Sequence, residues 1–146
     1  MAHLADVVLI VGAVLLRGAR APYVITEDMV RQLQEGTVIV DVSIDQGGCV
    51  ETSRPTSHSD PVFVKHGVVH YCVTNMPGAY PRTSTMALME ATIPYLLKLA
   101  NEGFENFIGE KGLSRAVNTY NGFLTCKPVA EELGLEEKYR EIEELI

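Results

Sequence analysis

Asp45 and Arg54 are the residues whose type and position most favour chemistry. An apolar run at residues 37–42 leads to Asp45, and the pair Gly47-Gly48 then permits a sharp backbone turn. In open α/β sheets, ligands bind just outside the carboxyl ends of the strands. A carboxylate at that place can orient a substrate or transfer a proton, and an arginine fork suits a phosphate or a carboxylate. The segment therefore predicts the rim of a small-molecule site.

Ordinary structural roles remain open for the same residues. Asp45 can cap its own turn, because aspartate often accepts a hydrogen bond from the backbone two residues on. Arg54 can be a surface cation in a weak ion pair. Cys49 and Cys72 read as small buried residues, since no motif pairs either thiol with a base, and His70 reads as a packed, hydrogen-bonded histidine.

Metal and nucleic-acid binding are not favoured. His58, Asp60 and His66 have irregular spacing and fit a solvated loop better than a metal site. The formal net charge of −7 over 146 residues argues against unaided binding of nucleic acid, which needs a concentrated basic face. We expect no metal and no nucleic-acid partner.

Cysteine use and hydropathy predict a cytoplasmic protein. The three cysteines lie far apart with no CxxC pair, which is typical of a reducing compartment. The apolar run at residues 7–16 is too short to span a bilayer, and the Asp6 before it is unlike the basic start of a signal peptide. We therefore expect no membrane association.

The pattern in the first part of the chain predicts three strands, the first two joined by a helix and the last two by a long loop. Residues 5–12, 37–42 and 68–73 are β-favouring apolar runs, as in parallel strands covered on both faces. Thr26 is placed to cap a helix that runs to about Gln34. A loop at residues 43–65 follows the second strand, and loops of this length are usually functional or disordered.

The second part of the chain reads as helical. A helix over residues 83–101, kinked at Pro94, carries an apolar stripe in which Met86 and Met89 are expected to be core residues. The remaining expected elements are short helices at residues 104–109 and 113–117, a turn at residues 121–122, and helical segments divided near Gly134, the last an amphipathic helix at residues 136–146.

The order of elements predicts an α/β fold: half of a Rossmann-type parallel sheet, with about three strands, followed by C-terminal helices. The expected domains are residues 1–82, which contain the half-sheet, and residues 83–146, which are helical. The sequence has no GxGxxG opening a helix, and no acidic residue about 20 positions beyond one. We expect the facing half of the site to lie outside this sequence.

Segments along most of the chain resemble alanine dehydrogenases. The resembling segments are residues 12–15, 21–22, 40–41, 44–49, 51–56, 70–78, 81–85, 91–95, 99–100 and 118–120. The related proton-pumping transhydrogenases share Gln46-Gly47-Gly48, whereas Ile44-Asp45 matches the dehydrogenase form. The likeness extends to about Gly134.

The resemblance implies an NAD-dependent enzyme that reversibly deaminates L-alanine to pyruvate and ammonia. Asp45 matches the family's catalytic aspartate, which also lies beside the cofactor. The other positions that match cofactor contacts are Val14, Leu15, Val42, Ser43, Ile44, Arg54, Val73, Thr74, Asn75 and Met76. The resemblance also implies that residues 1–82 are the second half of an NAD-binding domain, and that residues 83–146 return to a catalytic domain.

The family's substrate-carboxylate arginine, catalytic lysine and catalytic histidine have no match in this sequence. The resemblance therefore leaves two hypotheses. In the first, the enzyme is completed by a homo-oligomer, which is a dimer or larger, or by a complementing N-terminal chain. In the second, the chain is an inactive or split-enzyme fragment that binds nucleotide or a partner subunit.

Overall fold

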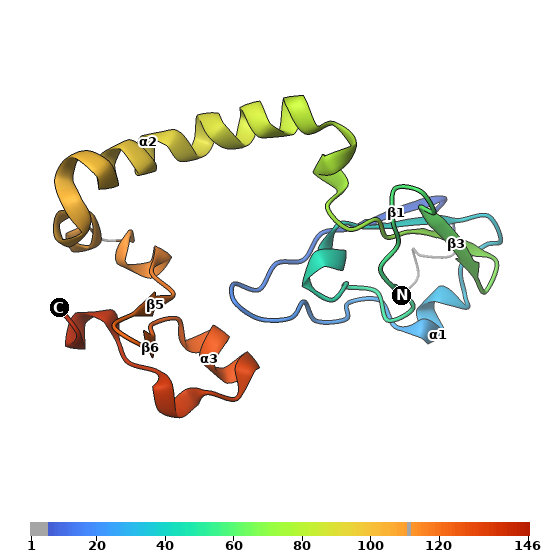
Figure 1. Ribbon diagram of the computed structural model, residues 1–146. Coiled ribbons are helices and arrows are strands. Elements are labelled where there is room, and N and C mark those ends of the chain that lie inside the picture. The colour runs from blue at the N-terminus through green and yellow to red at the C-terminus, as the bar shows by residue number, and fades with distance from the viewer. Residues whose placement is uncertain (1–5, 111) are drawn as a thin grey trace. The chain divides into compact units, whose positions relative to one another are not determined.

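The computed structural model describes residues 6–110 and 112–146 and divides into two compact units. The first unit contains the chain up to Leu16 together with Arg20–Ala79, and the second contains Arg17–Ala19 and Tyr80–Ile146. Figure 1 shows the elements of both units, coloured from blue at the N-terminus to red at the C-terminus.

A four-stranded sheet forms the centre of the first unit. Strands β1 (Leu9–Gly12), β2 (Val38–Asp41) and β4 (Val68–Tyr71) are parallel, and β3 (Val62–Lys65) runs antiparallel to β4, giving the order β1-β2-β4-β3. This is the α/β fold that the sequence predicts, with its three parallel strands at the expected positions. The first strand is shorter than expected, because Asp6 to Val8 are not in strand conformation, and residue 5 lies outside the described residues.

Strand β3 corrects the expectation of an irregular loop over residues 43–65. It is joined to β4 by His66 and Gly67, which both have positive φ, 55° and 76°. Two positive φ angles in a two-residue turn match the right-handed twist of a hairpin. The connection contains no Asn-Gly or Asp-Gly pair, so the usual sequence signal for such a turn is missing.

Helix α1 (Glu27–Val30) contributes Val30 to a small core that it forms with the sheet. The Thr26 hydroxyl caps it by accepting a hydrogen bond from the Met29 amide at 3.4 Å, as expected. The helix ends at Val30 and not near Gln34. The core cluster consists of Val30, Leu33, Ile39, Cys49, Val50 and Val68.

Helix α2 (Pro81–Gly109) is the longest element of the second unit. It continues through Pro94 and is broken at Gly103, whose φ of 80° and ψ of 169° are not helical. The break in the helix therefore occurs at the glycine and not at the proline. Met86 and Met89 are 63% and 44% exposed, so the expectation that they are core residues is wrong. None of the helices in the described ranges has the length and hydropathy to cross a membrane.

The rest of the second unit is built from short elements. They are the 3-10 helix η3 (Ser114–Ala116), the hairpin of β5 (Thr119–Tyr120) and β6 (Phe123–Leu124), α3 (Lys127–Leu133), and the 3-10 helices η4 (Glu136–Lys138) and η5 (Ile142–Glu144). Helix α3 ends at Gly134, as expected, with the glycine in a left-handed conformation.

The amphipathic helix expected over residues 136–146 does not form. The Arg140 amide donates a hydrogen bond to the Leu124 carbonyl at 2.9 Å, and Tyr139 forms a parallel bridge with Leu124. Backbone at these positions thus pairs with the β5–β6 hairpin. That pairing requires extended conformation in the middle of the expected helix, which leaves η4 and η5 on either side.

Candidate functional site

A buried carboxylate, Asp41, organises the loop that carries the predicted site. It ends β2, and its oxygens accept hydrogen bonds from the backbone amides of Ser43 at 3.1 Å, Cys49 at 3.0 Å and Val50 at 3.2 Å. A carboxylate that takes several amide donors holds their positions firmly. Asp41 is not among the site residues that the sequence predicts. Its signal is an aspartate at the end of an apolar strand, directly before a turn rich in glycine.

The loop leaves Asp41 as the 3-10 helix η1 (Val42–Gln46) and then turns at the glycine pair. Gly47 and Gly48 have φ angles of 93° and 77°, so the predicted sharp turn is present. A Cβ on Gly48 would lie 3.0 Å from the Oδ2 of Asp41. A side chain at position 48 would therefore disturb the carboxylate that organises the loop.

Asp45 joins the ends of β2 and β4. It lies on the exposed side of η1, and both of its carboxylate oxygens are 3.1 Å from the backbone amide of Asn75, which donates to them. Asn75 has a φ of 51°, in the left-handed region that asparagine tolerates better than most residues. Two residues that are 30 positions apart are thus in direct contact at the carboxyl end of the sheet.

His58 holds the other side of the Asn75 residue. Its Nε2 lies 3.2 Å from the Asn75 carbonyl oxygen. A carbonyl can only accept, so Nε2 carries the proton that is donated in this contact. The sequence predicts that His58 lies in a solvated loop. Its partner could not be found from the sequence, because Asn75 is 17 positions away and the contact is to the backbone.

Ser43 connects the ends of β1 and β2. Its hydroxyl accepts a hydrogen bond from the Val14 amide at 2.7 Å, and its side chain is buried. Leu15 and Val42 are exposed at the same end of the sheet, whereas Ile44 is buried and contributes its side chain to packing. The structure therefore brings Val14 and Ser43 together. The side chains that follow Val14 and precede Ser43 in the sequence, Leu15 and Val42, are exposed to solvent.

Arg54 is positioned by an aromatic ring. Its guanidinium carbon lies 4.2 Å from the centre of the Phe63 ring, a cation–π contact. No hydrogen bond or ion pair joins Arg54 to Asp45 or Asn75. The exposed arginine is thus held at β3, and its fork remains available to a negatively charged group.

The last predicted segment follows β4. Val73 is buried, and Thr74 donates from its amide to the Thr56 carbonyl at 3.1 Å. Met76 is half-buried and begins the 3-10 helix η2 (Met76–Ala79). These contacts fix the segment on both sides of Asn75, whose amide meets Asp45.

The buried histidine and thiols have structural positions. His70 Nδ1 lies 3.0 Å from the Val68 carbonyl and so donates to it, which leaves Nε2 to accept from the Thr52 hydroxyl at 2.7 Å. Burial lowers the pKa of His70 and raises the pKa of the Cys49 and Cys72 thiols. Each of these groups is therefore held in its neutral form.

The carboxyl end of the parallel sheet thus presents the exposed Asp45 carboxylate, held by the Asn75 amide, and the exposed apolar side chains of Leu15 and Val42. Such an edge suits a flat organic ligand whose polar groups face the carboxylate. No cluster of three or more metal-binding side chains is found among residues 6–110 and 112–146.

Comparisons with known proteins agree on one family. The pattern of the family described as "Alanine dehydrogenase/PNT, C-terminal domain" matches residues 1–127. "Alanine dehydrogenase 2" of Staphylococcus aureus is 54% identical over 140 residues, which are 94% of this chain and 37% of that relative. The chain thus spans little more than a third of the length of the curated relatives it matches.

Solved structures share the fold. A structure described as L-alanine dehydrogenase matches with a TM-score of 0.73 and 45% identity, covering 90% of this chain and 36% of its own. A transhydrogenase from Sinorhizobium meliloti matches in fold, with a TM-score of 0.63 and 21% identity, covering 86% of this chain and 33% of its own. Because the family pattern covers most of the sequence and the fold agrees, the chain belongs to the alanine dehydrogenase/PNT family, with the sequence of its C-terminal domain.

Proposed function

We propose that this chain forms the nicotinamide side of an NAD-dependent alanine dehydrogenase, with Asp45 as its catalytic residue. The reaction is the reversible oxidation of L-alanine, with water, to pyruvate and ammonia as NAD is reduced to NADH. Family membership supports this reaction class. The observation that carries the assignment is the exposed Asp45 carboxylate, fixed by the Asn75 amide between the ends of two parallel strands.

The residues present fit the nicotinamide end of NAD. Exposed Leu15 and Val42 offer apolar surface to a flat ring, and Asp45 offers a carboxylate to its polar edge. We assign cofactor contacts to these residues and to Val14, Ser43, Ile44, Arg54, Val73, Thr74, Asn75 and Met76. The diphosphate end lacks its glycine-rich turn in this sequence. Bound NAD would supply the hydride acceptor.

Asp45 has the capacity for a proton-handling role. A carboxylate has about four lone-pair positions, and the Asn75 amide lies between two of them. The exposed side can still accept from an ammonium group or a water molecule, at hydrogen-bond reach of the reacting carbon. Asp45 would thereby orient the amino group of alanine and pass a proton as ammonia or water adds and leaves.

Completion of the site needs a further chain or segment. We assign residues 1–82 to the second half of an NAD-binding domain, and residues 83–146 to a helical segment that meets a catalytic domain. A second copy of the chain or a complementing N-terminal chain would supply the groups that bind the substrate carboxylate. We expect the complete enzyme in the cytoplasm.

The test is turnover in a complemented mixture. The chain is combined with the part of the Staphylococcus aureus alanine dehydrogenase 2 that lies outside the matched region, and NADH formation from L-alanine is followed by absorbance. Asp45→Asn keeps the shape of the side chain but removes its charge and basicity. We expect it to reduce turnover by about 10²-fold or more.

The matched control is Asp28→Asn, which removes an equally exposed carboxylate from α1. We expect this variant to turn over L-alanine at the unmodified rate. Full activity of Asp45→Asn, or no NADH formation by a folded and associated wild-type mixture, would contradict the proposal.

A second candidate is a fragment that binds nucleotide or a partner subunit without turnover. It is favoured by the lack of a GxGxxG turn for the diphosphate in this sequence. Calorimetry with NAD separates the two functions: the enzyme requires binding and turnover in the complemented mixture, whereas the fragment shows binding of NAD or of the second chain alone.

A further inference from the structure

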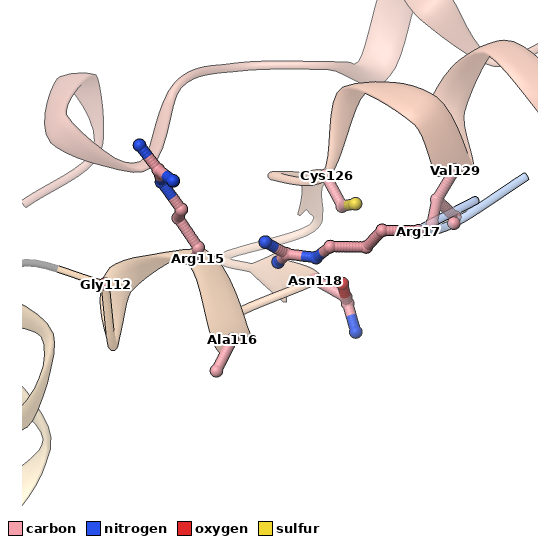
Figure 2. Close-up of a pocket in the computed structure, with 8 residues that line it drawn as sticks. Arg17, Gly112, Arg115, Ala116, Asn118, Cys126 and Val129 are labelled. Carbon is pink, nitrogen blue, oxygen red and sulfur yellow. The ribbon is translucent and has the colours of Figure 1, made fainter. Parts of the chain in front are cut away.

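Two arginines from distant parts of the sequence line one hollow of the second unit. Arg17 and Arg115 border a cavity of about 450 Å³, together with Asn118 and Cys126. An adjoining hollow of about 170 Å³ shares both arginines and is also lined by Lys127. Figure 2 shows Arg17 extended between Asn118 and Cys126, with its guanidinium turned toward the segment that carries Arg115.

A glycine allows Arg17 to reach this hollow. Gly18 has a φ of 73°, and a Cβ on it would lie 3.0 Å from Cγ2 of Val129 and 3.3 Å from Cβ of Pro128, both on α3. A residue with a side chain would be strained there and would push the segment away from α3. The close approach therefore fixes the position from which the Arg17 side chain extends.

Neither guanidinium has a protein partner in the described part of the chain. Other arginines do: Arg31 pairs with Glu27 at 3.0 Å, and Arg54 and Arg140 lie over aromatic rings. Among residues 6–110 and 112–146, no acidic residue lines either hollow. In a protein of net charge −7, two unpaired cations that face one cavity form a local site of positive potential.

The chemistry of the lining favours a phosphate group. Two guanidinium groups carry two positive charges, so together they match a dianion. A tetrahedral phosphate has enough oxygens to receive two forks at one centre, whereas a single carboxylate is filled by one.

The volume indicates a ligand larger than inorganic phosphate. A cavity of about 450 Å³ falls within the range of small-molecule sites. We propose that this hollow binds the phosphate group of a small phosphate ester through Arg17 and Arg115. The site lies in the second unit and is independent of the function proposed for Asp45.

The test measures binding to the full chain by calorimetry at constant ionic strength. The probes are glycerol phosphate, inorganic phosphate and malonate, a carboxylate dianion. We expect saturable binding of both phosphates, with the ester tighter than inorganic phosphate, and weaker binding of malonate. Arg17→Ala and Arg115→Ala should each weaken binding of the ester by about tenfold or more, since each removes a charge-assisted hydrogen bond.

The matched control is Arg82→Ala, which removes the same charge from α2 in the same unit, away from both hollows. It should leave binding unchanged. Circular dichroism verifies that each variant is folded; should Arg17→Ala unfold, Arg17→Lys keeps the charge and removes the fork, and we expect the same loss of binding.

Three results would overturn the proposal that this hollow binds a phosphate group. They are no saturable binding of either phosphate, malonate binding as tight as that of the ester, and an equal loss of binding in Arg82→Ala, which would indicate general attraction to positive charge. Inorganic phosphate binding more tightly than the ester would also reject the ester as ligand.

Discussion

At the scale of single residues, Asp41 and Asp45 divide two tasks between them. The Asp41 carboxylate is fully buried and satisfied by three backbone amides, whereas the Asp45 carboxylate is exposed and receives one. A buried carboxylate with several amide donors stabilises a fold, and an exposed one with free lone pairs can act on a ligand. The first aspartate therefore builds the loop on which the second is presented.

Asp41→Asn tests the structural half of this division. The amide that replaces the carboxylate turns an NH₂ group toward backbone N–H donors, so buried donors lose their acceptor. We expect the free energy of unfolding to fall by about 3 kcal/mol. Urea denaturation followed by circular dichroism measures the loss. Asp28→Asn, on the exposed face of α1, should change it by less than about 0.5 kcal/mol; equal stability of the two variants would reject the role of Asp41.

The sequence predicts the parts of the candidate site whose residues are neighbours in one segment, but not the contacts between separate segments. Asp45 and the Gly47-Gly48 turn are neighbours in the sequence, and the turn forms as expected. The contact of Asp45 with Asn75 and that of His58 with Asn75 join segments 30 and 17 positions apart through backbone groups. Any residue type offers a backbone N–H or C=O, except proline for the N–H, so such partners leave no residue signature.

At the scale of elements, the pair β3 and β4 is held by a buried histidine. His70 on β4 donates to the Val68 carbonyl, accepts from Thr52, and stacks on Phe63 of β3 with ring centres 4.8 Å apart. The pKa of His70 is lowered, chiefly by burial. Lys65 and His66 lower this pKa further, while the Val68 carbonyl and Asp41 raise it.

The histidine makes stability depend on pH in a defined direction. Below the ordinary pKa of 6.5, the unfolded chain binds a proton at His70 that the folded chain does not. The free energy of unfolding should therefore fall as the pH is lowered from 7.5 to 5.5. The pKa of Glu27 is lowered to about 2, mainly by its hydrogen bond with His66. Protonation of Glu27 therefore lowers the free energy of unfolding in a separate pH range, as the pH falls below the ordinary pKa of 4.5.

Urea denaturation at several pH values measures the slope. His70→Gln should flatten it between pH 7.5 and 5.5, and His58→Gln, which changes an exposed histidine, should leave it unchanged. A slope that persists in His70→Gln would show that another group is responsible.

The elements that the sequence predicts correctly are those with strong local signals. Apolar runs mark β1, β2 and β4, and Thr26 marks the start of α1. The sequence does not reveal β3, whose strand lies within a polar loop and whose turn is His66-Gly67. It predicts a helix over residues 136–146 wrongly, because the apolar spacing suits a helix while hydrogen bonding to Leu124 imposes extended backbone. Pairing with a separate segment overrides the local helical preference at residues 136–146.

At the scale of the whole molecule, each unit exposes apolar surface that a stable protein normally covers. In the second unit, α2 exposes several large apolar side chains, among them Met86, Leu88, Ile93, Tyr95, Leu96 and Leu97. In the first unit, β1 ends the sheet with Leu9 and Val11 at 53% and 60% exposure. Large exposed apolar patches and open strand edges mark surfaces that associate.

The two edges of the sheet differ in a way that favours association at β1. Strand β3 at the other edge contains Lys65, whose charge discourages pairing with another strand, although Val64 is 66% exposed. Strand β1 consists of Leu-Ile-Val-Gly and carries no charge. We therefore expect the chain to self-associate in solution through β1, as a dimer or larger.

Light scattering after size-exclusion chromatography tests this expectation, with 16.0 kDa as the mass of one chain. The unmodified chain should have at least twice that mass, and Val11→Lys should lower the mass by placing a charge at the β1 edge. Val64→Lys introduces the same charge on an equally exposed valine at the opposite edge and should leave the mass unchanged. Both variants change charge and hydropathy in the same way, so a difference between their masses in solution would show that the interface lies at β1. A single-chain mass at every concentration, or an equal effect of the two variants, would exclude association through this edge.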